Sequence, residues 1–157
     1  MDSMKLFSLL AFTALAFAGE DLSNIRVIYV LPMSGGLDQY LAVRLSAGGL
    51  VQVATDAQKA DAVLTDSIGP AFEQRLADLY APKKSDPNAK DRADSDFAKP
   101  TMKPLSHSRG NLFLVDRKTG NVLWSTNERS KSNTADALRS AADHIASRLE
   151  KVYKGGK

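Results

Sequence analysis

The sequence predicts an α/β domain built on a mixed β-sheet of about five strands with flanking helices. Three observations lead to this prediction. Apolar runs of strand length alternate with stretches of helical periodicity. The first strand, helix and second strand are spaced as in a βαβ unit with parallel strands. The segment Asn111–Ser125, NLFLVDRKTGNVLWS, fits a β-hairpin. The expected order of elements is β-α-β-β-α-β-β-α.

The first strand is expected at Ile25–Leu31, bounded by Pro32. Apolar residues on both of its faces indicate an interior strand, with Ile25, Val27, Tyr29 and Leu31 facing one way and Ile28 and Val30 the other. A helix follows the Met33–Gly36 turn and ends at Gly48-Gly49, one of which serves as a left-handed C-cap. Its buried face carries Leu37, Tyr40, Leu41, Arg44 and Leu45. The second strand is Leu50–Ala54.

The third strand is expected at Ala62–Ile68, after a single helical turn capped by Thr55 or Asp56. Pro70 is well placed at the first position of the next helix, which stops before Pro82. The buried face of this helix carries Phe72, Leu76, Leu79 and Tyr80.

The composition changes between residues 81 and 110, which hold four of the six prolines, many charges of both signs and few large apolar side chains. Such a stretch buries too little surface to offset its ordering entropy. We therefore expect residues 81–110 to be a disordered or flexible insertion, one long internal loop within the domain.

The hairpin strands are expected at Leu112–Val115 and Val122–Ser125, near the middle of the sheet. Gly120 supplies the positive φ of the turn. Val122 and Trp124 would share one face, and Trp124 is expected in the core. Asn133 or Thr134 would cap the last helix, whose apolar stripe is Leu138, Ala142, Ile145, Leu149 and Val152, with a fraying tail from Lys154.

The N-terminus has the features of a signal peptide. Lys5 is a positive n-region, Leu6–Phe17 is apolar, and Ala16-Phe17-Ala18 fits a signal-peptidase site. We expect cleavage after Ala18, a single domain over residues 19–157, and a periplasmic or extracellular location. The apolar run is short of the roughly 20 residues of a membrane span. Translation could start at Met1 or at Met4.

The formal net charge is +3, and the acids and bases are mixed rather than clustered. This pattern argues against a nucleic-acid partner. The chain has no cysteine, so we expect neither disulfides nor an N-terminal lipid anchor. No segment after the signal peptide is apolar enough to cross a membrane.

Few residues suggest chemistry. Ser34-Gly35-Gly36 follows a strand, as phosphate-binding turns do, but a tight turn is the favoured interpretation since no GxGxxG or Walker lysine is present. His107, beside Ser106 and Ser108, lies in the segment least able to hold catalytic geometry. His144 is expected to be solvated or half-buried, and two distant histidines without cysteine argue against a zinc site.

Asp56, Asp61 and Asp66 recur every five residues, a spacing that could suggest cation ligands, but capping and surface roles explain the first two. Asp66 interrupts an otherwise apolar strand. We expect it on an exposed face near the end of the strand. The alternative is that Asp66 is a functional carboxylate.

The segments ADAVLTDSIG (Ala60–Gly69) and FLVDRKTGNVLWS (Phe113–Ser125) resemble the CsgG-like group of bacterial envelope proteins, which includes LpoB-type activators and the N-terminal domain of TolB. The resemblance implies an α/β domain with a mixed sheet, and it implies no catalytic residues. Asp66 stands where that group usually has glycine. Channel subunits and LpoB-type members are lipoproteins, whereas this chain lacks the cysteine.

These observations predict an exported, non-catalytic binding or accessory module whose partner is a protein or another envelope component. A setting in cell-envelope assembly or maintenance fits the resemblance. We expect no catalytic, cofactor-binding or metal-binding residues and no cofactor. Two alternatives remain: a small hydrolase using Asp66 with a group from the Ser34 turn, and a self-assembling structural subunit. The sequence does not specify the oligomeric state.

Overall fold

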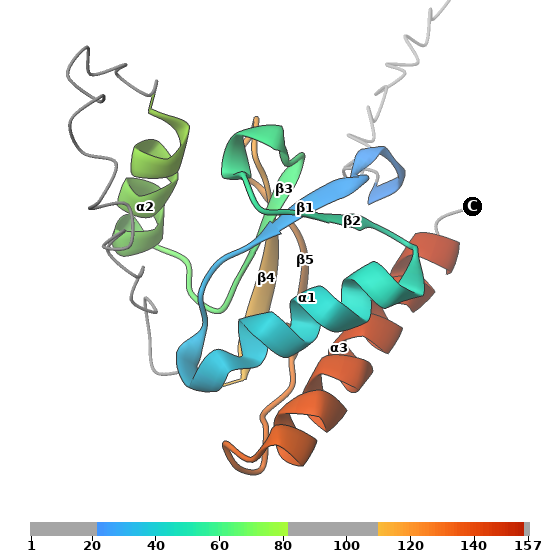
Figure 1. Cartoon of the computed structure of the whole chain (residues 1–157). Helices are drawn as coiled ribbons and strands as arrows, with labels where there is room; N and C mark the ends of the chain where they lie inside the picture. The colour runs from blue at the N-terminus through green and yellow to red at the C-terminus, as the bar shows by residue number, and fades with distance from the viewer. Residues whose placement is uncertain (1–21, 82–109, 156–157) are drawn as a thin grey trace, which may run out of the picture.

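The computed structural model of the chain describes residues 22–81 and 110–155. The predicted signal peptide, nearly all of the predicted flexible insertion, and His107 lie outside these ranges. The described residues form a five-stranded sheet with three α-helices, which confirms the predicted fold class (Figure 1).

The sheet is mixed and has the order β2-β1-β3-β4-β5. β1 is parallel to both β2 and β3, whereas β4 is antiparallel to β3 and β5. The strands are β1 (Val27–Val30), β2 (Gln52–Ala54), β3 (Ala62–Thr65), β4 (Asn111–Asp116) and β5 (Val122–Asn127). The predicted parallel βαβ unit and the hairpin are therefore both confirmed.

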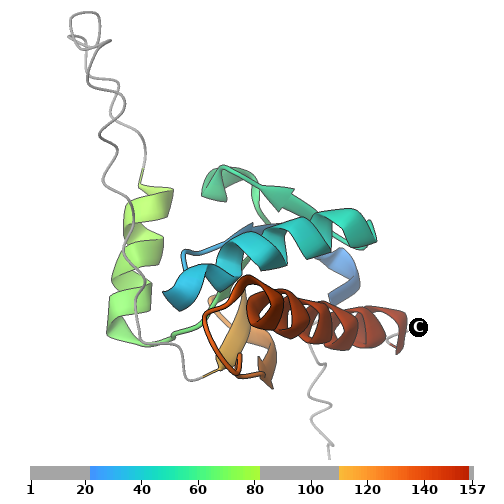
Figure 2. The same ribbon diagram turned by 60° about the horizontal axis from the view of Figure 1, so that its bottom comes forward.

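Helices cover both faces of the sheet. α1 (Leu37–Gly48) and α3 (Ala135–Gly155) pack side by side on one face, and α2 (Pro70–Tyr80) covers the other (Figures 1 and 2). A hydrophobic core lies on each face of the sheet, and successive residues of the interior strands contribute to one core and then to the other. Leu64 and Leu114 contribute to the core under α1 and α3, and Val63 and Val115 to the core under α2. This alternation explains why the interior strands are apolar on both faces.

Several local predictions are confirmed. Asp56 caps the short 3-10 turn Ala57–Lys59 by accepting from the Gln58 backbone N–H. Pro70 begins α2, and Gly49 has the left-handed conformation (φ 64°) at the C-cap of α1. The predicted apolar stripes of α2 and α3 face the sheet, except that Val152 on α3 is exposed.

Other predictions are wrong in detail. β5 is an edge strand rather than a central one, and it extends two residues beyond Ser125. The register shifts between Leu114 and Val115, so that Leu114 pairs with Trp124 but Val115 pairs with Val122. This bulge breaks the expected alternation. Trp124 packs, partly buried, against the core under α1 and α3, whereas Val122 is exposed on the opposite face.

The boundaries also differ from those predicted. β1 and β2 are each shorter than predicted, and α3 continues through Lys154 to Gly155. β3 ends at Thr65 rather than at Ile68. There the Thr65 hydroxyl donates to the Ser67 carbonyl and accepts from the Ser67 N–H, a local turn that competes with the strand ladder.

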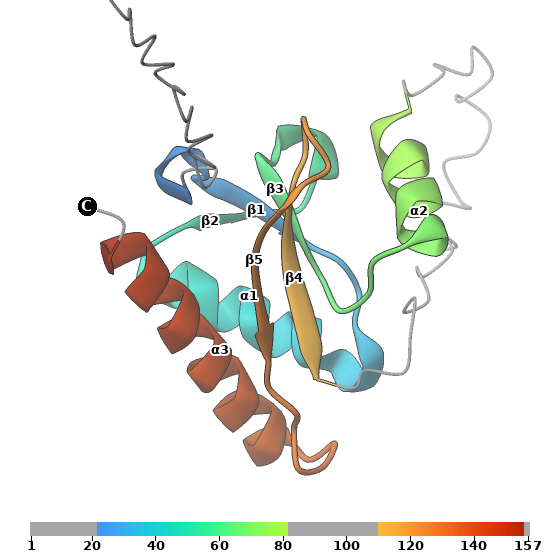
Figure 3. The same cartoon turned by 180° about the vertical axis from the view of Figure 1, so that it is seen from behind.

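The central strands form a topological switch point. The chain leaves β1 toward α1 on one face and leaves β3, the next strand in the sheet, toward α2 on the other face (Figure 3). In open α/β sheets, ligands bind in the crevice outside the carboxyl ends of strands at such a point. A ligand site is therefore expected at this end of the sheet.

Candidate functional site

Two buried carboxylates hold the connection between β1 and α1. Asp38, in the first turn of α1, accepts from the backbone N–H of Met33 at 3.1 Å. Asp66, directly after β3, accepts from the backbone N–H of Ser34. Two consecutive amides of the connection are thus each bound by an aspartate from a different element. Both aspartates are almost fully enclosed, with 8% of Asp38 and 7% of Asp66 exposed.

The environment of Asp66 is unfavourable for a negative charge. Burial raises the pKa of the Asp66 carboxyl, and the nearby Asp38 carboxylate raises it further, while hydrogen bonds from the backbone of Ser34 and of Asp66 itself oppose the shift. Within residues 22–81 and 110–155, its Oδ2 atom is buried without a hydrogen-bond partner. The expectation that Asp66 lies on an exposed face is therefore wrong, because β3 ends beneath the β1–α1 connection instead of at the surface.

The Ser34-Gly35-Gly36 segment forms a 3-10 turn. The Gly36 N–H donates to the Met33 carbonyl at 3.2 Å, and the Met33 and Ser34 amides are bound by the two aspartates. A phosphate cradled by this turn would need such amides to be free. The observed bonding favours the tight-turn interpretation.

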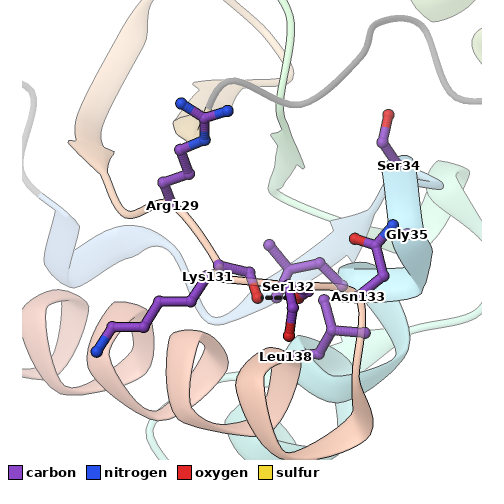
Figure 4. A pocket seen from close by; sticks show the side chains of 9 residues that line it. Ser34, Gly35, Arg129, Lys131, Ser132, Asn133 and Leu138 are labelled. Atoms are coloured by element: carbon purple, nitrogen blue, oxygen red, sulfur yellow. Dashed lines mark hydrogen bonds between the residues drawn. The ribbon is translucent and has the colours of Figure 1, made fainter.

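Beside this turn lies an open pocket of about 560 Å³. One wall is the start of α1 and the turn before it; the other is the connection from β5 to α3. The lining residues are Ser34, Gly35, Leu37, Arg129, Ser130, Lys131, Ser132, Asn133 and Leu138. Figure 4 shows the Arg129 and Ser34 side chains rising on opposite sides, Asn133 beside Gly35, and the Lys131 side chain extending away from the others. We refer to this as the carboxyl-end pocket.

Gly110 fixes the position of Arg129 at this pocket. The Glu128 N–H donates to the Gly110 carbonyl at 2.7 Å, and Gly110 has φ 85°. A Cβ atom at Gly110 would lie 2.9 Å from the backbone N and Cα of Arg129. Only glycine satisfies both the conformation and this close approach.

The three evenly spaced aspartates do not form one site. Asp56 and Asp61 precede β3, whereas Asp66 follows it, so the strand separates them. The Asp61 Oδ2 atom accepts from the backbone N–H groups of Arg26 and Val27, each at 2.9 Å. Among the described residues, no group of three or more potential metal ligands is found.

His144 joins a polar cluster that attaches α3 to the end of β5. Its Nδ1 lies 3.1 Å from Glu128 Oε1, and Arg148 lies 3.0 Å from Glu128 Oε2. Arg148 also donates to the Asn127 carbonyl at 2.9 Å. His144 is exposed, in agreement with the solvated alternative in the prediction, and it does not meet Ser34 or Asp66 in one pocket.

Ser34 and Asp66 were predicted together as one alternative, and the structure joins them through the Ser34 backbone. Arg129 and Lys131 were not predicted as site residues, and Asn133 was predicted only as a possible cap of the last helix. The available signal was the segment Arg129–Asn133, in which cations alternate with serines. Nothing in that segment indicates that it faces the β1–α1 turn.

Comparisons with protein-family models, with curated proteins and with solved structures found no match to this chain. Within residues 22–81 and 110–155, no helix has the length and apolar character needed to span a membrane.

Proposed function

We propose that this chain is an exported, non-catalytic binding or accessory module of the bacterial cell envelope. The signal-peptide features support export, and the resemblance to CsgG-like proteins supports an envelope setting. The partner is a protein or another envelope component, and the carboxyl-end pocket is the recognition site. This location follows the general rule for switch points in α/β sheets.

One observation carries the proposal. The two carboxylates nearest the switch point, Asp38 and Asp66, bind the Met33 and Ser34 backbone amides. These two carboxylates fix the shape of the pocket wall. A nucleophilic mechanism would need a base directed at the reacting group, and neither carboxylate is bonded in that way. A recognition surface supported by rigid buried groups fits this arrangement better.

A direct binding experiment tests the proposal. The protein, purified as the cell exports it, is used to capture partners from envelope extract, and the captured partner is then purified and titrated. We expect saturable binding that is weakened by the double variant Arg129→Glu, Lys131→Glu. The matched control is Lys59→Glu, Lys118→Glu, which makes the same charge change at exposed residues away from the pocket. No saturable partner, or equal weakening by both double variants, would contradict the proposal.

A hydrolase using Asp66 is the second candidate. The raised pKa of Asp66 and its unpartnered Oδ2 atom among the described residues favour it, since general acids are often carboxyls of this kind. A hydrolytic activity that is lost in Asp66→Asn, while that variant remains folded, would support the enzyme over the binding module.

A further inference from the structure

The carboxyl-end pocket has cations and hydrogen-bond donors but no acid in its lining. Arg129 and Lys131 line it, with the polar side chains of Ser34, Ser130, Ser132 and Asn133. Asp38 and Asp66 are close in the fold, but their carboxylates turn inward to backbone amides.

Glu128, the acid nearest to these cations in the sequence, is already bound to other side chains. Glu128 directs Oε1 to His144 and Oε2 to Arg148, so both of its oxygens are bound on the α3 side. Within the described ranges, neither Arg129 nor Lys131 forms an ion pair. The positive charge at the pocket is therefore not neutralised by its neighbours.

The backbone adds to this positive potential. Leu37, the first residue of α1, lines the pocket, as do Asn133 and Leu138 on either side of the start of α3 at Ala135. Helix amino ends carry partial positive charge. Asp38 and Asp136, in the first turns of α1 and α3, offset some of it.

We propose that the carboxyl-end pocket binds an oxyanion, a phosphate or carboxylate group of the envelope component recognised by the chain. The inference rests on the proposed function and adds the chemistry of the ligand. Arg129 is the principal contact, because a guanidinium presents paired donors that match two oxygens of either group. The Asn133 side-chain amide supplies a further donor, and Lys131 contributes charge at the rim. The Ser130 and Ser132 hydroxyls are already bonded, to the Ser132 carbonyl and to Thr134 respectively.

The test is a titration of the ¹⁵N-labelled protein, purified as the cell exports it, followed by NMR at constant ionic strength with chloride. Inorganic phosphate and acetate are titrated separately. We expect saturating shifts of the amide signals of residues 34–36 and 129–133, with half-saturation on the order of 1–10 mM, the range of a weak anion site. The anion with the lower half-saturation concentration identifies phosphate or carboxylate as the preferred group.

Arg129→Gln should raise the half-saturation concentration about fivefold, as expected for loss of one partly exposed charge contact. The control is Arg26→Gln, an exposed arginine that does not line the pocket; it should change the value less than about twofold. No saturating shift with either anion, or equal weakening by both variants, would overturn the inference. The titration with small anions needs no protein partner. Its failure would therefore overturn only the oxyanion site, and the capture experiment would still test the proposed function.

Discussion

Two aspartates flank β3 and meet opposite environments. At the amino end of the strand, Asp61 accepts two backbone hydrogen bonds at 2.9 Å and anchors the start of β1. At the carboxyl end, Asp66 is buried beside Asp38, with one oxygen unpartnered among the described residues and with its pKa raised. An aspartate thus stabilises the amino end of β3, whereas the aspartate at its carboxyl end is held in an unfavourable environment.

The amino end of β3 also has one unsatisfied group, because the Tyr80 hydroxyl, beside Arg117, is buried without a hydrogen-bond partner among the described residues. Two further polar groups there are paired. At the amino end of β3, Asp116 accepts from the backbone N–H groups of Lys118 and Thr119 in the hairpin turn, both at 2.7 Å. Tyr153, from the last turns of α3, donates its hydroxyl to the Ile25 carbonyl at 3.1 Å. Proteins keep destabilising groups mainly where function requires them. We therefore expect substitutions at the amino end to change mainly stability, and the proposed recognition to involve the carboxyl end.

The largest effect is expected at the amino end. Asp61→Ala removes a charged acceptor from the Arg26 and Val27 amides and should lower the free energy of unfolding by about 2 kcal/mol. Urea denaturation at pH 7 measures this loss. Asp61→Asn keeps one acceptor oxygen and should recover part of it. An alanine variant that is as stable as the wild type would contradict the assignment of stabilising contacts to the amino end of β3.

Asp66→Asn should act in the opposite direction. An amide removes the buried charge and its repulsion with Asp38, so the free energy of unfolding at pH 7 should rise by about 1 kcal/mol. Because the pKa of Asp66 is raised in the folded state, protonated Asp66 contributes to wild-type stability below its ordinary pKa of 3.8, and this contribution is lost as the pH rises through the folded-state pKa. The advantage of the variant should therefore be smallest below about pH 4 and grow toward neutral pH.

Denaturation curves from pH 3 to 7 measure this difference. Asp78→Asn, an exposed change on α2, is the matched control and should show no such trend. If Asp66→Asn proves less stable than the wild type at pH 7, the carboxylate contributes to the fold and the assignment of strain to this end fails.

Tyr153→Phe should give the smallest effect. Loss of the hydrogen bond to the Ile25 carbonyl should cost about 0.5 kcal/mol at neutral pH. Burial, with Asp61 nearby, raises the pKa of Tyr153 to about 12. The wild type should therefore lose its advantage over the variant as the pH rises from about 10 to 12, because the unfolded chain ionises first. An advantage of the wild type that persists undiminished above pH 12 would show that ionisation of the Tyr153 hydroxyl does not control it, and would contradict this prediction.

Much of the fold could be predicted because its signals are local. The apolar runs around Ile28 and Leu114 identified interior strands, and Pro70 and Gly49 marked helix ends that the structure confirms. The bulge at Trp124 could not be predicted, since it depends on the register of β5 against β4. The edge position of β5 likewise depends on the order of strands in the sheet.

The candidate site was less predictable. Ser34 and Asp66 were identified as one alternative, but the burial of Asp66 and its bond to the Ser34 amide were not. The sequence indicated no site role for Arg129 or Asn133, because that role depends on a contact with a turn nearly a hundred residues earlier in the chain.

Local patterns in the sequence were sufficient to identify the segments that become strands and helices and, apart from β5, the faces that they bury, because hydrophobic periodicity and turn chemistry act over a few residues. The tertiary structure alone decided that Asp61 is satisfied and Asp66 is strained, and that the β1–α1 turn meets the β5–α3 connection. Desolvation and charge proximity depend on what surrounds a group in space. The order of strands, with helices leaving β1 and β3 toward opposite faces, supplies those surroundings here.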